Sequence, residues 1–101
     1  METDRRVVIT GCGVISPLGI GKEANWEGII QGKNGIGPIT SFDASEYKSR
    51  IAGEVRDFDP FDYLDTREVK RNDRFCHLVL VAAEEAMKDA SLDMDREDPE
   101  R

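Results

Sequence analysis

The sequence contains few of the residues that define disulfide-rich, metal-binding or membrane proteins. Its 101 residues include two cysteines, Cys12 and Cys76, and one histidine, His77. Two cysteines without a CxxC pair do not make the disulfide framework of a small secreted protein, and a lone histidine cannot complete a zinc site with them. The longest nearly apolar run, residues 78–83, is far too short for a bilayer-spanning helix. We therefore expect no disulfide scaffold, no metal site and no membrane span.

Positive charge is also in the minority. Fourteen lysines and arginines face 21 aspartates and glutamates, so the net charge is −7. General nucleic-acid binding needs an overall basic surface, and this balance argues against it. The first residues lack a basic region followed by an apolar core, which is the pattern of a secretory signal. We expect a soluble, cytoplasmic protein with reduced thiols, whose partners include neither nucleic acid nor a membrane.

The most informative stretch is residues 5–19, with the sequence RRVVITGCGVISPLG. Its β-branched residues at positions 7–9 would be apolar on both faces of a strand, which is typical of a parallel strand covered on both sides. We predict a strand over residues 5–11 and a glycine-rich loop over 11–21. A buried strand needs partner strands, and the remaining residues hold few candidates. The sequence therefore predicts an α/β fold that is incomplete on its own and forms the beginning of a larger protein.

Two longer helices are predicted. The first covers residues 22–31, begins after Gly21 as N-cap and ends at Gly32, with one apolar face formed by Trp26, Ile29 and Ile30. The second covers about residues 73–90, where apolar residues recur at i, i+3, i+4 and i+7 along its whole length. This pattern predicts a mostly buried helix capped by Asn72 or Asp73.

Shorter elements are predicted between and after these helices. They comprise an irregular segment over residues 33–42, a single helical turn starting at Asp43, a short extended segment over 51–55, a short helix over 60–64 capped by Asp59, a turn over 67–71 capped by Thr66, and an acidic flexible tail over about residues 93–101.

Three features that suggest chemistry have simpler interpretations. Gly11-x-Gly13 after a strand is the start of a dinucleotide fingerprint, but Ser16 occupies the third glycine position, so we interpret the glycines as admitting close packing. Neighbouring residues on a helix point about 100° apart, so Cys76 and His77 do not face each other as nucleophile and base. We expect packing roles for both cysteines and a surface or hydrogen-bonding role for the histidine.

A basic cluster leaves two interpretations open. Arg67, Lys70, Arg71 and Arg74 are spaced at i, i+3, i+4 and i+7, so they could share one helical face. One interpretation is an exposed face partly neutralised by the acidic residues at positions 65, 68 and 73. The other is a docking patch for an acidic partner, which would raise the association rate and weaken with salt.

The chain resembles the β-ketoacyl-[acyl-carrier-protein] synthases of fatty acid synthesis over residues 5 to about 92. Residues 16–19 and 73–75 resemble the type II elongating enzymes in particular. The resemblance is carried, in order, by residues 5–19, Trp26 within its helix, residues 32–36, Phe42-Asp43 before Tyr47, residues 51–55 leading to Phe58-Asp59, and residues 70–75 running into Ala82-Ala83.

The resemblance implies a thiolase-like α/β fold with duplicated five-layer halves and a homodimer. Residues 1–101 would be the N-terminal segment of the first half, with one core parallel strand over residues 5–11 and the long helix packed on its sheet. The implied reaction is a decarboxylative condensation. An acyl group moves from the carrier protein to a cysteine, malonyl-carrier protein loses carbon dioxide, and the carbanion attacks the thioester. No metal and no other cofactor is implied.

The resemblance also implies where the functional residues lie. The nucleophilic cysteine and both catalytic histidines of the family lie beyond Arg101, so this segment would hold no catalytic residue. Arg67, Lys70 and Arg71 match basic positions that dock the acidic acyl carrier protein, and Arg74 is an extension from spacing. We expect the chain alone to be inactive, and poorly folded or prone to aggregation.

Two other functions remain open. The chain could belong to a polyketide ketosynthase or to a chain-length-factor subunit without the cysteine, which the downstream nucleophile motif would distinguish. It could also be a stand-alone module that binds acidic proteins through its basic helix, which a stop codon directly after Arg101 would favour.

Overall fold

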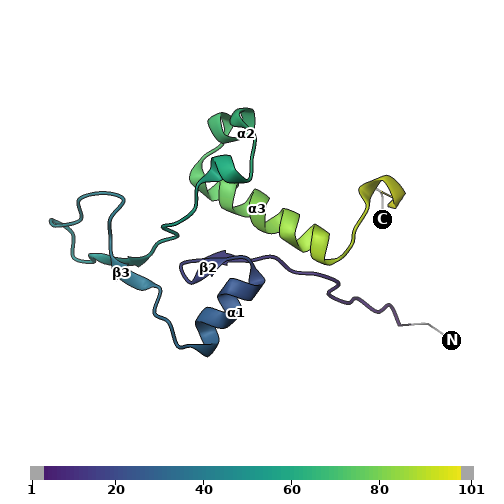
Figure 1. Cartoon of the computed structure of the whole chain (residues 1–101), viewed down its shortest axis with the longest axis horizontal. Helices are drawn as coiled ribbons and strands as arrows, with labels where there is room; N and C mark the ends of the chain where they lie inside the picture. The colour runs from purple at the N-terminus through teal and green to yellow at the C-terminus, as the bar shows by residue number, and fades with distance from the viewer. Residues whose placement is uncertain (1–3, 99–101) are drawn as a thin grey trace.

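The computed structural model describes residues 4–98 and shows short elements joined in an open arrangement (Figure 1). No helix within this range is long and apolar enough to cross a membrane. The elements in chain order are β1 (Ile15–Ser16), β2 (Gly19–Ile20), α1 (Lys22–Ile30), β3 (Ile36–Pro38), β4 (Ile51–Gly53), η1 (Pro60–Asp62), α2 (Thr66–Arg71), α3 (Arg74–Asp89) and η2 (Met94–Arg96), where η marks a short 3₁₀ helix.

Both sheets are two-stranded and antiparallel. β1 pairs with β2 with Ile15 opposite Ile20, and β3 pairs with β4 with Ile36 opposite Gly53. β4 confirms the predicted extended segment, whereas the β1–β2 hairpin and β3 lie in segments predicted as a loop and as irregular. Ladders of two or three residues are too short to show the alternation by which a strand is found in a sequence.

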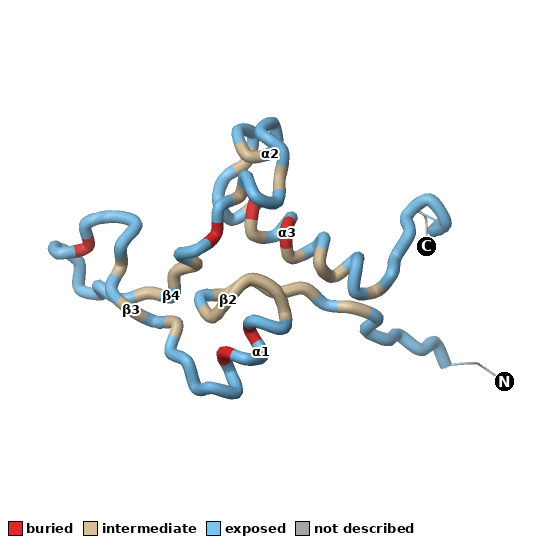
Figure 2. The backbone as a smooth tube through the Cα atoms, in the orientation of Figure 1, coloured by how far each residue is buried: buried red, intermediate tan, exposed pale blue. Residues whose placement is uncertain are grey.

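The prediction of a strand over residues 5–11 is not confirmed, because the structure assigns no strand there. The segment runs outward from the body, with Val7 95% and Ile9 91% exposed (Figure 2). A strand forms only where neighbours satisfy its backbone hydrogen bonds, and residues 4–98 contain no such neighbour for it. The apolar segment is therefore not enclosed by the other described residues, and the parallel pairing expected for the fold is absent among them.

Gly11 and Gly13 lie against the backbone of α3. A Cβ on Gly13 would lie 2.9 Å from both the Ala82 carbonyl carbon and the Ala86 nitrogen, and closer still to the Ala82 oxygen. A Cβ on Gly11 would lie 2.6 Å from the Ala86 oxygen. The interpretation of Gly11-x-Gly13 as a close-packing motif is confirmed, since the segment can approach the helix only without side chains at these two positions.

Two carboxylates of α3 hold the segment that follows these glycines. Glu85 Oε1 accepts a hydrogen bond of 2.9 Å from the Val14 N–H, and its Oε2 accepts one of 3.0 Å from the Lys22 N–H at the start of α1. Asp89 accepts from the Cys12 N–H at 3.1 Å and forms an ion pair with Lys22, whose hydrogen bond lowers the pKa of Asp89. Glu85 thus caps α1, because Gly21 has no side chain to do so.

Helix α1 confirms the predicted helix and its flanking glycines, since Gly21 is the N-cap and Gly32 follows with φ of 68°. The face that packs is not the predicted one. Asn25 and Gly28 are buried, whereas the apolar face that includes Trp26 is exposed. Asn25 Nδ2 donates to the carbonyl oxygens of residues 19 and 21 at 2.8 and 2.7 Å, so polar contacts with the hairpin orient the helix.

Helix α3 confirms the long helix and its cap at Asp73, which makes no side-chain capping bond. Only His77 and Val81 of this helix are buried. Phe75 and Val79 are 65% and 63% exposed, so the expectation of a mostly buried helix is wrong for the described residues. The apolar pattern marks the face that requires cover, and residues 4–98 cover little of it.

The segment between β3 and β4 is organised by Glu54. Its carboxylate accepts hydrogen bonds of 3.1 Å from the Thr40 and Ser41 N–H groups and one of 3.0 Å from the Thr40 hydroxyl. Desolvation raises the pKa of Glu54, but these hydrogen bonds outweigh it and lower the pKa to about 2. The helical turn predicted at Asp43 is a non-helical turn, in which Asp43 accepts from the Ser45 N–H at 3.0 Å.

The predicted acidic tail contains one short element, η2, in which Asp93 accepts a hydrogen bond of 3.0 Å from the Asp95 N–H. Residues 99–101 of that prediction lie outside the described residues. Flexibility of the tail stays a prediction.

Candidate docking surface

Two aspartates build the lobe that carries the basic cluster. Asp59 accepts a hydrogen bond of 3.0 Å from the Phe61 N–H and starts η1, which confirms the predicted cap. Asp65 accepts one of 2.8 Å from the Glu68 N–H and starts α2. The cap is therefore Asp65 rather than Thr66, which is the first residue of the helix. An N-cap carboxylate satisfies free N–H groups and interacts favourably with the helix dipole.

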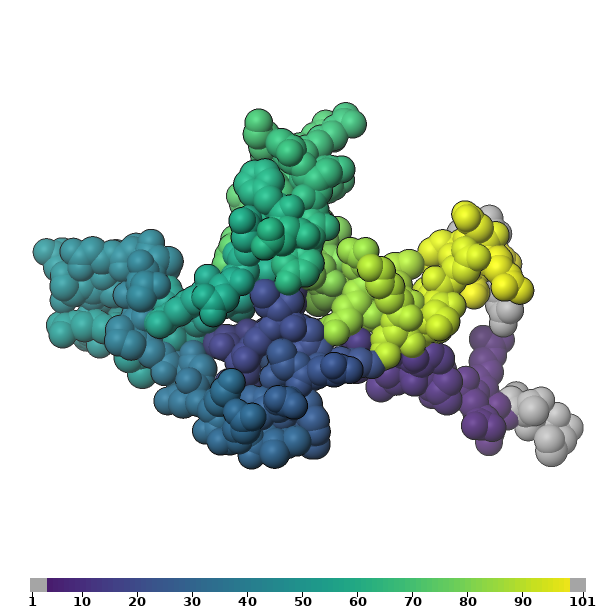
Figure 3. All heavy atoms as spheres, viewed as in Figure 1, coloured from purple at the N-terminus to yellow at the C-terminus, as the bar shows by residue number. Residues whose placement is uncertain are grey.

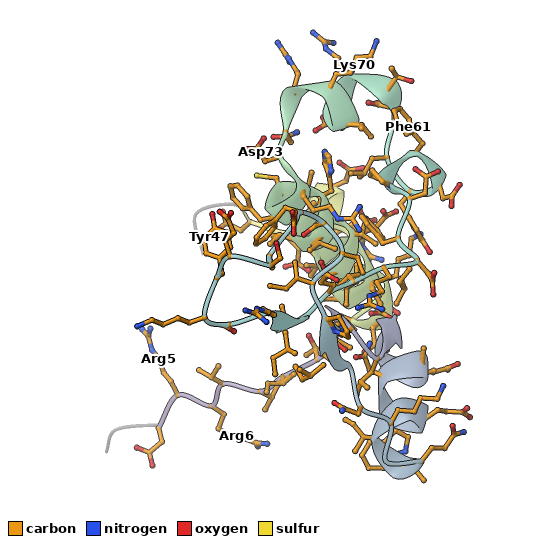
Figure 4. All side chains as sticks on the ribbon, turned by 90° about the vertical axis from the view of Figure 1, so that its left-hand side faces the viewer. Arg5, Arg6, Tyr47, Phe61, Lys70 and Asp73 are labelled. Atoms are coloured by element: carbon orange, nitrogen blue, oxygen red, sulfur yellow. The ribbon has the colours of Figure 1, made fainter. Side chains whose placement is uncertain are left out.

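Arg67, Lys70 and Arg71 lie on α2 and are all exposed. We call these three residues the α2 patch. Helix α2 stands at the end of a projecting lobe (Figure 3), and Lys70 points away from the rest of the chain (Figure 4). Within residues 4–98 none of the three forms an ion pair. The patch therefore presents three cations to solvent, two of them in the last turn, where the helix dipole favours positive charge.

Arg74 is not part of this surface. Helix α2 ends at Arg71, and Asn72 follows in an extended conformation with φ −125° and ψ 155°, so the i+7 spacing does not continue on one helix. The Arg74 guanidinium donates to the Phe58 carbonyl at 2.9 Å and to the Val55 carbonyl at 2.8 Å, and its centre lies 5.0 Å from the centroid of the Phe58 ring. Its donors and charge are engaged in holding the base of the lobe.

Two of the last four carbonyls of α2 have hydrogen-bond partners among the side chains that follow the helix. Asn72 Nδ2 donates to the Glu68 oxygen at 2.8 Å, and His77 Nε2 lies 3.0 Å from the Val69 oxygen. His77 is 6% exposed, so it is not a surface residue, and the hydrogen-bonding alternative is the correct one. The sequence gives no local signal for this contact, because Val69 and His77 lie on different helices.

The cysteines show no catalytic arrangement. Cys12 is exposed and Cys76 is half-buried, so the expected packing role does not hold for Cys12 among the described residues. His77 adjoins Cys76 in sequence but directs its Nε2 to a backbone carbonyl. Within residues 4–98 no group of three or more histidine, cysteine, aspartate or glutamate residues could hold a metal ion.

A shallow hollow of about 300 Å³ lies between the β1–β2 hairpin and the β3–β4 sheet. Its charged lining includes Glu54 and Arg56. Arg56 donates to the Pro38 carbonyl at 2.7 Å and pairs with Glu54 at 3.3 Å, so both charges hold local backbone in place. The three cations of the α2 patch, in contrast, form no ion pair within the described residues.

Comparison with known proteins places the chain in a family. Residues 4–101 match the model of the β-ketoacyl synthase N-terminal domain. The chain is 51% identical over 88 residues to a 3-oxoacyl-[acyl-carrier-protein] synthase 2 of Synechocystis. This match covers 87% of this chain and 21% of that protein. It is 43% identical over all 101 residues to the protein of the same name from Staphylococcus aureus strain COL, of which it covers 24%.

A solved structure supports the same assignment. The ishigamide ketosynthase/chain length factor matches with a TM-score of 0.81 and 38% identity, over 92% of this chain and 23% of that one. The chain thus spans about a quarter or less of the length of these relatives. Because the family model covers almost every residue, the chain belongs to the β-ketoacyl synthase family, in the region of its N-terminal domain.

Proposed function

We propose that this chain forms the N-terminal part of a type II 3-oxoacyl-[acyl-carrier-protein] synthase, which elongates fatty acyl chains by decarboxylative condensation. The observation that carries the proposal is the 43–51% identity to proteins named 3-oxoacyl-[acyl-carrier-protein] synthase 2. In the reaction, malonyl-carrier protein loses carbon dioxide and its carbanion forms a carbon–carbon bond with an enzyme-bound acyl group. The nucleophilic cysteine and the two histidines of this reaction belong to the remainder of the synthase.

The proposed role of residues 5–11 is structural. In the complete synthase they form a parallel strand in the core of a thiolase-like half, and the neighbouring strands cover both of its faces. The 95% exposure of Val7 and 91% exposure of Ile9 support this role, since an apolar segment of this kind is stable only when it is covered. We also propose that the synthase is a cytoplasmic homodimer.

The proposed role of the α2 patch is to dock the acidic acyl carrier protein. Three exposed cations on one short helix create a local positive potential on a chain whose net charge is −7. Such a patch attracts an acidic partner selectively, raises the association rate and orients the complex, and its effect weakens as salt screens the charges. The carrier protein then presents its thioester to the active site in the rest of the enzyme.

Condensation by the full-length protein is the first test. Purified full-length protein is incubated with an acyl-carrier protein and malonyl-carrier protein, and the 3-oxoacyl product and the released carbon dioxide are measured. We expect both in equal amounts, without added metal or nicotinamide. Failure to form the carbon–carbon bond with any acyl chain length would refute the proposed activity.

Charge reversal tests the docking role. Arg67→Glu combined with Lys70→Glu in the full-length protein should raise KM for carrier-bound substrate at least tenfold at low salt, since two attractions of roughly 0.5–1 kcal/mol each become repulsions. Lys33→Glu with Lys48→Glu is the matched control, because these exposed lysines lie outside α2 and the net charge changes equally. An unchanged KM for the α2 variant, or an equal rise in the control, would exclude the α2 patch as the docking site.

A second candidate function is that of a ketosynthase/chain-length-factor pair, because the solved structure that matches this chain carries that name. Its 38% identity is lower than the 43–51% of the synthase 2 relatives. Condensation by the purified protein without a second, different subunit favours the synthase. Activity that appears only after such a subunit is added favours the pair.

A further inference from the structure

Helix α2 is too short to be stable without contacts from outside it. It contains six residues, and isolated helices of fewer than about 12 residues are marginal in water. None of its residues is buried, so packing of an apolar face contributes little. The geometry of the α2 patch therefore depends on the hydrogen bonds at the two ends of the helix, of which the N-terminal one comes from Asp65.

The C-terminal end of α2 is held by a buried side chain of α3. His77 lies on α3, is 6% exposed, and its Nε2 lies 3.0 Å from the carbonyl oxygen of Val69. That oxygen is one of the last four carbonyls of α2, which have no partner within a helix. A carbonyl oxygen only accepts, so Nε2 carries the proton and donates it. Val69 immediately precedes Lys70 in the α2 patch, so this bond acts directly on the patch backbone.

The contact from His77 differs in kind from the other C-terminal contact. Asn72 donates to the Glu68 oxygen from the residue that directly follows α2, so it moves with the helix. His77 is anchored in the 16-residue α3, one turn before the buried Val81. Its bond to Val69 therefore fixes α2 relative to the body of the molecule rather than only closing the helix end.

We propose that His77 is a positioning residue for the α2 patch, acting through the Nε2–H···O=C bond to Val69. The proposal rests on the docking function proposed above. It predicts that loss of the donor leaves the charges of the patch intact but loosens their orientation. Binding of the carrier protein then weakens, whereas the chemistry of the bound acyl group does not change.

The test compares His77→Leu with His77→Gln in the full-length synthase. Leucine is similar in volume and cannot donate, whereas the glutamine amide restores a donor near the position of Nε2. We expect His77→Leu to raise KM for carrier-bound substrate about threefold to tenfold, as expected for the loss of one hydrogen bond, with kcat unchanged. The KM for an acyl thioester of coenzyme A, which lacks the carrier protein, should not change. His77→Gln should restore KM for the carrier-bound substrate.

Val81→Ala is the matched control for general destabilisation of α3. Val81 is 8% exposed on the same helix and makes no hydrogen bond to α2. It should lower the unfolding midpoint without raising KM for the carrier-bound substrate. If Val81→Ala raises this KM as much as His77→Leu, or if His77→Gln fails to restore it, the positioning role is wrong.

If the charge reversal in α2 raises KM but His77→Leu does not, only this inference fails and the docking function stands. If the charge reversal has no effect, the docking function itself fails.

Discussion

Replacement of Gly13 by alanine tests the contact between the glycine-rich segment and α3. Gly13 does not have a positive φ, so alanine causes no backbone strain at this position. Its Cβ would lie 2.9 Å from the Ala82 carbonyl carbon and from the Ala86 nitrogen. These are backbone atoms in the middle of a helix, and they cannot rotate away as the end of a side chain could. Either α3 or the segment must therefore shift.

The magnitude follows from three contributions. Insertion of a methyl group into a packed contact costs about 1–3 kcal/mol. A shift of the segment also weakens the 2.9 Å hydrogen bond from Val14 N–H to the Glu85 carboxylate, and bonds to charged groups are worth roughly 1.5–3 kcal/mol. The lower entropy of the unfolded chain with alanine returns about 0.4–1 kcal/mol. We expect a net loss of about 2–4 kcal/mol in the free energy of unfolding.

Equilibrium and thermal unfolding of the full-length protein measure this loss, with Gly37→Ala as control. A Cβ on Gly37 meets only Arg56 Nη2, at 3.3 Å, so at most the surface hydrogen bond and ion pair of that side chain shift, and no helix backbone has to move. Gly13→Ala should therefore unfold at a clearly lower denaturant concentration and temperature than Gly37→Ala. Equal midpoints for the two variants would show that the segment does not pack against α3 as described.

Two further changes are predicted to alter stability. Glu54 has its pKa lowered to about 2 from 4.5, so its hydrogen bonds contribute stability fully above about pH 4.5, and this contribution is lost as the pH falls toward 2. The stability difference between wild type and Glu54→Gln, measured by urea unfolding at several pH values, should shrink below pH 4.5, and a constant difference would contradict the assignment. Asp65→Ala removes the cap of α2 and should destabilise the helix by about 1 kcal/mol, seen as faster amide hydrogen exchange at residue 68, whereas unchanged exchange would show that the cap is not needed.

The sequence predicted the positions of elements better than the faces that they bury. The periodic pattern located α3, and glycines marked both ends of α1. In α1, however, the apolar side of the helix that includes Trp26 is exposed, and Asn25 forms the contacts instead. Periodicity identifies which residues share a face, but the neighbour that covers the face is a property of the whole fold.

The basic cluster shows the same limit at the candidate site. Spacing alone placed Arg74 with Arg67, Lys70 and Arg71, although the helix breaks at Asn72 and turns Arg74 toward the Phe58 and Val55 carbonyls. The i, i+7 rule holds only while one helix continues, and here two extended residues, Asn72 and Asp73, separate the two helices. The hydrogen-bonding role of His77 was among the predictions, but its partner was not, because Val69 lies on another helix and no local pattern points to it.

The described chain is open and leaves much of its apolar surface uncovered. Its radius of gyration is 17.8 Å, against about 13 Å for a compact domain of this length, and its buried apolar residues within 4–98 are only Ala44, Phe58 and Val81.

The exposed surfaces are of two kinds, and the difference supports the docking role that we propose for α2. Large apolar residues are exposed on the N-terminal segment, on α1 and on α3. Permanent interfaces are rich in such residues and poor in charge, so these faces are suited to lasting cover by other parts of a synthase. The outward side of α2 instead carries cations, which speed a reversible encounter and are released by salt. Under the proposed function a carrier protein must leave after each turnover, so the charged end of the lobe is better suited to that proposed docking than the larger apolar faces are.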